Sequence, residues 1–291
     1  MNLDGLSSET HIEFDRSLID DILVLDGRPI QGGGLDRTRL LLNRVRQLAG
    51  IKIYAHVESS NNFPAGTGIA SSASGFAALA AAAACATGLE LDEAGVSRLA
   101  RRASGSACRS VPGGFVEWLA GNDDRDSYSV SIASVDYWEL VDCIAILSLE
   151  HKAVSSSIGH ELASTSSLQK ARIEGSHLRL ETCRQAIINR DFQTLADVAE
   201  LDSNLMHAIM MTSSPRLIYW LPGTLEIIHA VISWRKEGWK VFYTIDAGAN
   251  VHVICTAEEA EIIRNQLILL PGVMQVLTAR PGGSAHCITN K

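Results

Sequence analysis

The sequence predicts a chain that mixes α-helices and β-strands in one elaborate domain or two smaller ones. Three observations lead to this prediction. With 291 residues, 46% of them hydrophobic and 20% charged, the chain is long enough to bury a large core. Short apolar runs typical of strands alternate with helical patterns in the first half. A mostly helical stretch follows and leads to a last group of strands.

Periodicity and chain-breaking residues place the individual elements. Leu41, Val45 and Leu48 share one face of a helix that Gly50 ends. Apolar residues alternate with polar ones from position 51 to 57, which indicates a half-buried strand. The expected strands are 9–14, 22–25, 51–57, 115–119, 128–133, 141–149, 241–245, 251–255 and 273–277. The expected helices are 36–48, 76–87, 92–100, 167–190, 192–211, 222–236 and 258–270.

The most informative stretch runs from Asn61 to Gly75 and leads into an alanine-rich helix that Gly88 closes. The first backbone N–H groups of a helix have no internal partner and lie at the positive end of its dipole. Phosphate oxygens bind well there, and Ser71 and Ser72 add hydroxyl donors. A core helix with an ordinary serine cap explains this stretch equally well by itself.

A second loop of similar character lies near residues 100–118, where small hydroxyl residues and glycines alternate with arginines. Ser104 and Ser106 supply hydroxyl donors. Arg102 and Arg109 lie in the same loop, and the forked guanidinium of Arg109 suits an oxyanion. The composition of this loop therefore indicates a second anion-binding segment.

Asp246 ends an apolar strand and begins the turn 246–250. Such an aspartate usually forms a turn by bonding to its own backbone. The two anion-binding loops shift the balance towards a functional role, in which the carboxylate orients or deprotonates a substrate hydroxyl.

Composition excludes several classes of protein. The formal charge of −8 disfavours nucleic acid and anionic membranes as partners. The chain begins without a signal-like region, and its longest apolar run, 76–86, is too short to cross a bilayer. His160-Glu161 begins like a zinc-protease motif, but Ser164 stands where the second histidine is needed, so no structural metal is expected.

The cysteines are spread along the chain with no paired spacing, and several lie in apolar runs. This pattern predicts reduced core thiols in a cytoplasmic protein rather than a set of disulfides. The residues concerned are Cys85, Cys108, Cys143, Cys183, Cys255 and Cys287.

Three stretches carry a resemblance to a known family: Asn61-Asn62-Phe63-Pro64 with Gly68 to Gly75; Arg102 to Arg109 with Gly113-Gly114-Phe115-Val116-Glu117-Trp118; and Thr244-Ile245-Asp246-Ala247-Gly248-Ala249-Asn250. They resemble, in the same order, the signature regions of the diphosphomevalonate decarboxylase family, within the GHMP kinase superfamily. The similarity extends over nearly the whole chain and includes Asp202-Ser203-Asn204 and His207.

The resemblance implies an α+β, two-lobed GHMP kinase-like fold with the active site in the cleft between its halves. Residues 1–139 correspond to the ATP-binding domain, of the ribosomal S5 domain 2-like type. Residues 140–291 correspond to the ferredoxin-like C-terminal domain. The implied enzyme is a cytoplasmic, homodimeric lyase of isoprenoid biosynthesis. It uses ATP and Mg²⁺ to decarboxylate a phosphorylated mevalonate to an isopentenyl product, with release of ADP, phosphate and CO2.

The resemblance also assigns roles to residues. Asp246 acts on the C3 hydroxyl of the substrate, Arg109 clamps the substrate carboxylate, and both are expected to be catalytic. Ser104 and Ser106 contact substrate phosphate or hydroxyl groups. The expected ATP-binding residues are Asn62, Gly68, Ala70, Ser71 and Ser72, of which Ser72 also contacts Mg²⁺.

The chain departs from the family pattern in three ways. The family strand with the Lys-Tyr-Trp-Gly-Lys segment has no counterpart before Met1, which is expected to leave a sheet edge unpaired and to weaken substrate and nucleotide contacts. Glu161 stands near a position where diphosphate-using members usually carry a lysine or arginine. Ala103 and Ala249 replace the usual glycine and proline, which is expected to change loop stiffness more than chemistry.

The departure at Glu161 makes a phosphomevalonate decarboxylase, which yields isopentenyl phosphate, the main alternative, because a negative charge disfavours a diphosphate more than a monophosphate. Two further alternatives are a small-molecule kinase of the same superfamily and a non-catalytic relative. The presence of both Arg109 and Asp246 argues against a kinase.

Overall fold

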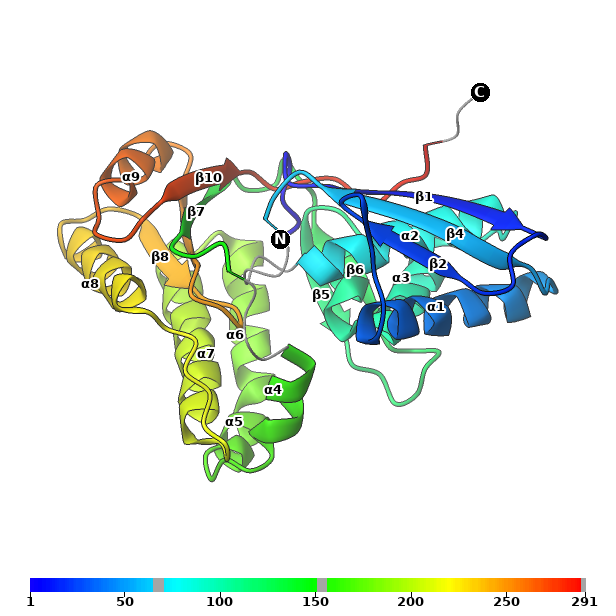
Figure 1. Ribbon diagram of the computed structural model, residues 1–291. Helices are drawn as coiled ribbons and strands as arrows, with labels where there is room; N and C mark the ends of the chain where they lie inside the picture. Colours follow the sequence, from blue (N-terminus) through cyan, green and yellow to red (C-terminus); the bar gives the residue numbers. More distant parts are fainter. Residues whose placement is uncertain (65–70, 151–155, 289–291) are drawn as a thin grey trace. The chain divides into compact units, whose positions relative to one another are not determined.

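The computed structural model describes residues 1–64, 71–150 and 156–288. The chain forms two compact units. The first contains the described residues in 1–137 together with the C-terminal segment from Pro281, and the second contains the described residues in 138–280. Both combine sheets with helices (Figure 1), so the predicted α+β class is confirmed.

The first unit is built on a four-stranded sheet with strand order β1-β4-β2-β3. The central strand β4 pairs antiparallel with β1, in a register that places Ser8 opposite Asn61, and parallel with β2. The strands are β1 (Ser8–Asp15), β2 (Ile22–Leu25), β3 (Arg28–Pro29) and β4 (Tyr54–Asn61). A hairpin of β5 (Phe115–Leu119) and β6 (Tyr128–Ala133) forms a separate two-stranded sheet.

Three helices and one 3₁₀ segment complete the described part of the first unit: α1 (Gly33–Ala49), α2 (Ser71–Ala86), α3 (Glu93–Ala103) and η1 (Gly105–Ser110). Figure 1 shows α1, α2 and α3 on one side of the β1-β4-β2 sheet. Their apolar faces and those of the strands form one core, in which α2 contributes mainly alanines and Phe76. The small side chains allow α2 to pack against α3 and η1.

The C-terminal segment of the chain runs along the first unit and is fixed to it. Ala285 N–H donates to the Val111 carbonyl at 2.9 Å, and Gly114 N–H donates to the Gly282 carbonyl at 2.8 Å. Gly113 has to be glycine here, because a Cβ atom would lie 2.7 Å from the Ser284 nitrogen.

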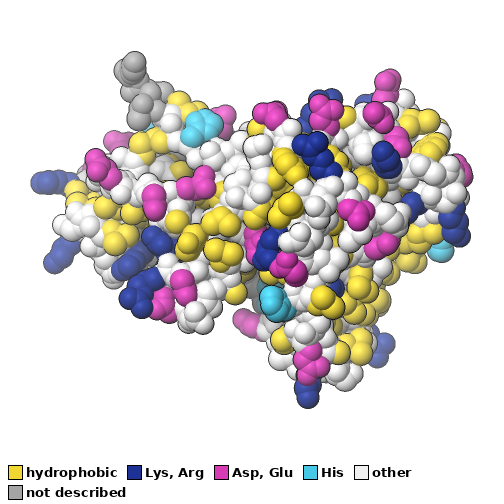
Figure 2. Space-filling view, turned by 180° about the vertical axis from the view of Figure 1, so that it is seen from behind, with side chains coloured by type: hydrophobic (Ala, Val, Ile, Leu, Met, Phe, Trp, Pro, Cys, Tyr) yellow, Lys and Arg dark blue, Asp and Glu magenta, His cyan; other side chains and the backbone are white. Residues whose placement is uncertain are grey.

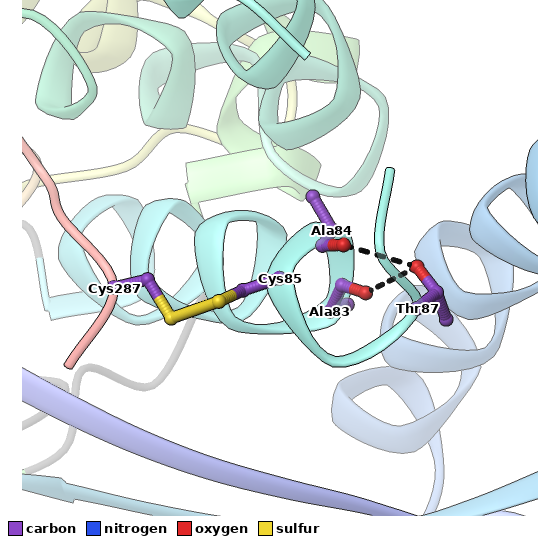
Figure 3. Close-up of a disulfide and its surroundings, with 5 residues drawn as sticks. All are labelled: Ala83, Ala84, Cys85, Thr87 and Cys287. Carbon is purple, nitrogen blue, oxygen red and sulfur yellow. Dashed lines mark hydrogen bonds between the residues drawn. A yellow bond between two sulfur atoms is a disulfide. The ribbon is translucent and has the colours of Figure 1, made fainter. Parts of the chain in front are cut away.

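A disulfide joins this C-terminal segment to α2, between Cys85 and Cys287 (Figure 3). The prediction that all six cysteines are reduced thiols is therefore wrong for this pair. The two residues lie 202 positions apart in the sequence, and only the return of the chain to α2 brings their Cα atoms within 6.5 Å. Cys108, Cys143, Cys183 and Cys255 are not in disulfides, and all but Cys183 are buried.

The disulfide gives a testable prediction for stability. Cys287→Ser removes a cross-link that closes a long loop, so the free energy of unfolding is expected to fall by about 2–4 kcal/mol. Thermal unfolding measures the change. Dithiothreitol should lower the midpoint of the wild-type chain and leave that of Cys287→Ser unmoved; equal midpoints in all four samples would contradict the prediction.

The second unit is built on an antiparallel sheet with strand order β10-β7-β9-β8. Its strands are β7 (Leu140–Ile146), β8 (Val241–Thr244), β9 (Val251–Thr256) and β10 (Gln275–Ala279). Two helices, α8 (Pro222–Lys236) and α9 (Ala260–Leu267), contribute to its apolar core with the alternate residues Val251, Val253 and Cys255 of β9.

The remaining helices of the second unit are α4 (Ser156–Ala163), α5 (Gln169–Glu174), α6 (Ser176–Asn189) and α7 (Phe192–Thr212). Helix α7 begins at an Asp191 cap and packs against α6 and strand β8. Helix α4 packs on α7 through a small cluster that includes Ala163 and Ile209. The single helix predicted over 167–190 is two helices, separated at Gly175.

None of the helices in the described part of the chain is long and apolar enough to cross a membrane. On the face shown in Figure 2, acidic side chains are interspersed with Lys and Arg.

Candidate active site

The start of α2 has the features of an anion-binding helix terminus. The helix begins at Ser71, so Ser71 and Ser72 lie in its first turn rather than in the preceding loop. No acidic residue occupies this turn, and Ser72 is exposed. The positive end of the helix dipole therefore favours an anion here. The predicted residues Gly68 and Ala70 lie outside the described residues.

Asn62, also predicted to bind ATP, is engaged in local structure. Its amide nitrogen donates to the Gly5 carbonyl at 2.9 Å, and its amide oxygen accepts from Ser7 N–H at 2.9 Å. The Asn62 side chain thus fixes the end of β4 to the segment before β1.

The second predicted loop lies where α3 passes into η1, which packs against α2. The hydroxyl oxygens of Ser104 and Ser106 lie 3.4 Å apart, so both hydroxyls occupy one small region. The Arg109 side chain is exposed and makes no hydrogen bond or ion pair with the described residues. The two predicted anion-binding segments are therefore neighbours within the first unit, and the Arg109 guanidinium is available to a ligand.

The arginines before η1 are engaged differently. The Arg101 and Arg102 guanidinium groups both pair with Asp124, Arg102 at 2.5 Å, and Arg101 also donates to the Ser127 carbonyl at 3.0 Å. Of the arginines in the predicted oxyanion loop, the structure leaves only Arg109 without a carboxylate partner among the described residues.

In the second unit, Asp246 begins the turn that joins β8 to β9. Strand β8 ends at Thr244, one residue earlier than predicted, because the buried Ile245 bonds to side chains of α7 instead of to the sheet. The Asp246 side chain is exposed and forms no hydrogen bond or ion pair with the described residues. The usual role of such an aspartate, bonding to its own turn, is therefore not seen.

The pKa values of two buried histidines in the second unit, His207 and His252, are shifted in opposite directions. Burial lowers the pKa of His207 to about 4, although its bond to the Ile245 carbonyl and the charge of Asp246 act in the other direction. Burial also disfavours charge on His252, but the Asp142 carboxylate, 2.7 Å from its Nδ1 atom, outweighs burial and raises its pKa to about 9. His207 is therefore neutral and His252 charged at neutral pH.

These pKa values predict an optimum of stability near pH 6.5. Below the unfolded-state pKa of about 6.5, His207 is protonated in the unfolded chain, whereas in the folded chain it stays neutral down to about pH 4. The free energy of unfolding therefore falls as the pH falls. Above pH 6.5, His252 is neutral in the unfolded chain but stays protonated in the folded chain up to about pH 9. The free energy of unfolding therefore falls as the pH rises.

Each group contributes at most about 1.4 kcal/mol per pH unit to the free energy of unfolding. Urea unfolding at a series of pH values measures the profile. His207→Gln should flatten only the acid limb and His252→Gln only the alkaline limb, and unchanged limbs in both variants would contradict the assignment.

The segment that carries Glu161 belongs to α4, where the Glu161 side chain is exposed. The next cation along the chain, Lys170, lies 3.9 Å from Glu174 on α5. Within the described residues, no group of three or more His, Cys, Asp or Glu side chains could hold a metal ion. Mg²⁺ usually binds through substrate phosphates and water with few protein ligands, so the exposed Ser72 hydroxyl at an anion-binding helix start fits such an ion.

Two polar contacts around the Asp246 turn and strand β9 did not follow from sequence patterns. Thr224, on α8, donates its hydroxyl to the Ala249 carbonyl at 2.9 Å, and Asp142 pairs with His252 from the neighbouring strand. Both contacts depend on how distant segments pack. The one available signal was a polar residue, Asp142, inside an otherwise apolar strand.

Comparisons with known proteins match both parts of the chain. Residues 1–129 match a diphosphomevalonate decarboxylase-like N-terminal domain, and residues 143–276 match a mevalonate 5-diphosphate decarboxylase C-terminal domain. The phosphomevalonate decarboxylase of Haloferax volcanii is 34% identical over 256 residues, which cover 87% of this chain and 78% of the relative. The diphosphomevalonate decarboxylase of Saccharomyces cerevisiae is 38% identical over 274 residues, which cover 87% of this chain and 67% of the relative.

Solved structures agree with these matches. The mevalonate diphosphate decarboxylase of Staphylococcus aureus has a TM-score of 0.91 at 32% identity and covers 97% of this chain and 86% of its own. The structure described as MDDEF in complex with MVAPP, AMPPCP and magnesium has a TM-score of 0.90 at 34% identity, with 97% and 87% covered. Because the similarity in sequence and structure extends over both parts of the chain, the protein belongs to the diphosphomevalonate decarboxylase family.

Proposed function

We propose that this chain catalyses the ATP-dependent decarboxylation of (R)-5-diphosphomevalonate to isopentenyl diphosphate, with release of ADP, phosphate and CO2. The observation that carries this proposal is the similarity of nearly the whole chain to a structure that holds MVAPP, AMPPCP and magnesium. The reaction belongs to isoprenoid biosynthesis by the mevalonate pathway.

We propose that the first unit holds the nucleotide. The N–H groups at the start of α2 and the hydroxyls of Ser71 and Ser72 would donate to ATP phosphates, with Asn62, Gly68 and Ala70 nearby in the sequence. Ser72 would contact Mg²⁺, which neutralises charge on the phosphates when bound. Ser104 and Ser106 would contact the substrate. Residues 1–139 would thus serve as the ATP-binding domain and 140–291 as the C-terminal domain.

We propose that Asp246 and Arg109 are the catalytic residues. Asp246 accepts the proton of the C3 hydroxyl while the hydroxyl oxygen attacks the γ-phosphoryl group of ATP, and ADP leaves. The C3–O bond then breaks and phosphate departs, so positive charge develops at C3. The bond between C2 and the carboxylate carbon breaks next and CO2 leaves. The electron pair of that bond forms the alkene between C2 and C3. Arg109 holds the carboxylate in place, as its unpaired guanidinium permits.

A second candidate is the corresponding decarboxylation of 5-phosphomevalonate to isopentenyl phosphate. Two observations favour it: Glu161 is exposed on α4 where a cation is usual, and a relative with 78% of its length matched is a phosphomevalonate decarboxylase. A carboxylate close to a diphosphate repels it more strongly than a monophosphate.

A substrate panel separates the two candidates. The chain is offered mevalonate, its 5-phosphate and its 5-diphosphate in parallel, and ADP and CO2 are measured for each. A higher kcat/KM with the diphosphate supports the first candidate, and the reverse supports the second. Glu161→Lys should shift the preference towards the diphosphate, whereas Glu161→Gln should shift it less.

We also propose that the chain works as a homodimer in the cytoplasm. The resemblance to the family supports both the dimer and the cytoplasmic location, whereas the Cys85–Cys287 disulfide is an observation against a reducing compartment. Analytical ultracentrifugation tests the oligomeric state.

A further inference from the structure

The turn that carries Asp246 is held by buried polar side chains from outside the turn and by its own last residue. We propose that Ser203 and His207, on α7, are positioning residues that set the direction of the Asp246 carboxylate by fixing the backbone of Ile245. This inference rests on the proposed function, in which Asp246 acts on the substrate hydroxyl.

Ile245 lies just beyond the end of β8, and its side chain is buried. Its backbone groups therefore need partners that the sheet does not supply. The Ser203 hydroxyl oxygen accepts from Ile245 N–H at 3.0 Å and lies 3.3 Å from the Ile245 carbonyl, to which it donates. His207 Nε2 lies 3.1 Å from the same carbonyl. The residue before Asp246 is thus fixed through both its donor and its acceptor.

Ser203 and His207 are four positions apart on α7, so they lie on the same face of the helix, one above the other. Only 6% of Ser203 and 2% of His207 is exposed. Buried hydrogen bonds of this kind are costly to break, because neither the side chains nor the Ile245 backbone groups can form replacement hydrogen bonds with water. The rigid helix therefore fixes the Ile245 backbone in place.

His207 acts as a hydrogen-bond donor and not as an acid or base. A carbonyl oxygen only accepts hydrogen bonds, so Nε2 must carry the proton of the ring. The ring lies against the aromatic rings of Tyr219 and Trp220, with centroids 6.1 and 5.0 Å away. Burial among these rings keeps the pKa near 4, so the ring stays neutral and its donor stays fixed across the neutral pH range.

The other end of the turn is held as firmly. The Thr224 hydroxyl, fully buried, donates to the Ala249 carbonyl at 2.9 Å. The Asn250 side chain, 1% exposed, accepts from the N–H groups of Leu147 at 2.8 Å and Ser148 at 3.1 Å. Both ends are therefore anchored, while Asp246 itself is exposed. A carboxylate presented from a rigid turn is what a reaction that depends on orientation requires.

Three substitutions test this inference in the full chain. His207→Phe keeps an aromatic ring against Tyr219 and Trp220 but removes the donor, and should lower kcat by about tenfold to a hundredfold, because small displacements of a reacting group are costly. The KM for ATP should stay within about twofold. His207→Gln keeps a donor near the position of Nε2 and should recover most of the lost rate. Ser203→Ala should resemble His207→Phe.

Asn204→Ala is the matched control. Asn204 lies on the same helix and donates to the Tyr243 hydroxyl at 2.9 Å, a contact with β8 that involves no residue of the turn 246–250. Its loss should lower the thermal midpoint without lowering kcat by more than about twofold. A decrease in kcat for Asn204→Ala as large as that for His207→Phe would assign His207 to general stability.

The coupling to Asp246 is the decisive readout. In an Asp246→Asn background, His207→Phe and Ser203→Ala should have no further effect on the residual rate, because they act through the missing carboxylate. Full additivity, or folded His207→Phe and Ser203→Ala chains with wild-type kcat, would overturn the inference. If the wild-type chain itself releases neither ADP nor CO2, the proposed function fails first, so the two failures are distinguishable.

Discussion

Asp246→Asn is expected to lower kcat for CO2 release by about a thousandfold or more. The substitution keeps the size of the side chain but removes the base that accepts the proton of the C3 hydroxyl, and general base catalysis contributes about 10²-fold to 10⁴-fold. The turn should keep its shape, because its anchors bond to Ile245 and Ala249 and not to the carboxylate. Steady-state assays of ADP and CO2 measure the effect.

Two controls define the outcome for Asp246. ATP binding, followed by calorimetry, should be retained, because ATP is assigned to the first unit. Asp197→Asn changes a carboxylate that is 61% exposed on α7 and should leave kcat within about twofold. CO2 release by Asp246→Asn at near the wild-type rate would refute the role of Asp246 as base.

Arg109→Gln is expected to lower kcat/KM for the phosphorylated mevalonate by about 10²-fold to 10³-fold, since loss of one well-placed charged donor costs that much in comparable sites. Arg109→Lys should recover only part of the loss, because an ammonium group cannot grip a carboxylate with two parallel bonds. The KM for ATP should change little. Steady-state kinetics with each substrate varied separates these effects.

The matched control for Arg109 is Arg125→Gln. The Arg125 side chain is 90% exposed and pairs with Asp123 on the surface, so its loss should not alter kcat/KM. Equal behaviour of the Arg109 and Arg125 variants would remove Arg109 from the catalytic residues.

Much of the fold was predictable from local patterns. Strands β2, β5 and β6 and helix α8 have the predicted bounds, because clear periodicity and turn residues define them. Strand β4 begins at Tyr54, three residues later than predicted. The reason is that Ile51 N–H donates to the Arg46 carbonyl and thereby extends the end of α1. Apolar alternation alone does not reveal such a competing hydrogen bond.

Two strands end earlier than predicted because side chains distant in the sequence bond to the backbone groups that the sheet was expected to use. Strand β7 ends at Ile146 and not at 149, because the amides of Leu147 and Ser148 bond to Asn250, about a hundred residues away. The end of β8 moved for the same reason, through Ser203 and His207. Neither effect is visible to a short sequence window.

The candidate site was predictable in chemical type more than in contacts. The patterns identified the start of α2, the Arg109 segment and the Asp246 turn as places for anion binding and acid–base chemistry. They selected Arg109, but they did not show that Arg102 pairs with Asp124 whereas Arg109 has no such partner among the described residues. Nor did they pair Cys85 with Cys287, because a separation of 202 residues leaves no local signal.

The stoichiometry of ADP and CO2 tests the central claim most directly. The purified chain is incubated with ATP, Mg²⁺ and limiting 5-diphosphomevalonate or 5-phosphomevalonate, and both products are counted against the substrate consumed. The proposed reaction predicts one ADP and one CO2 for each molecule of the preferred substrate. Formation of ADP without CO2 would show a kinase that stops at phosphoryl transfer, and would contradict the assignment of this chain as a decarboxylase.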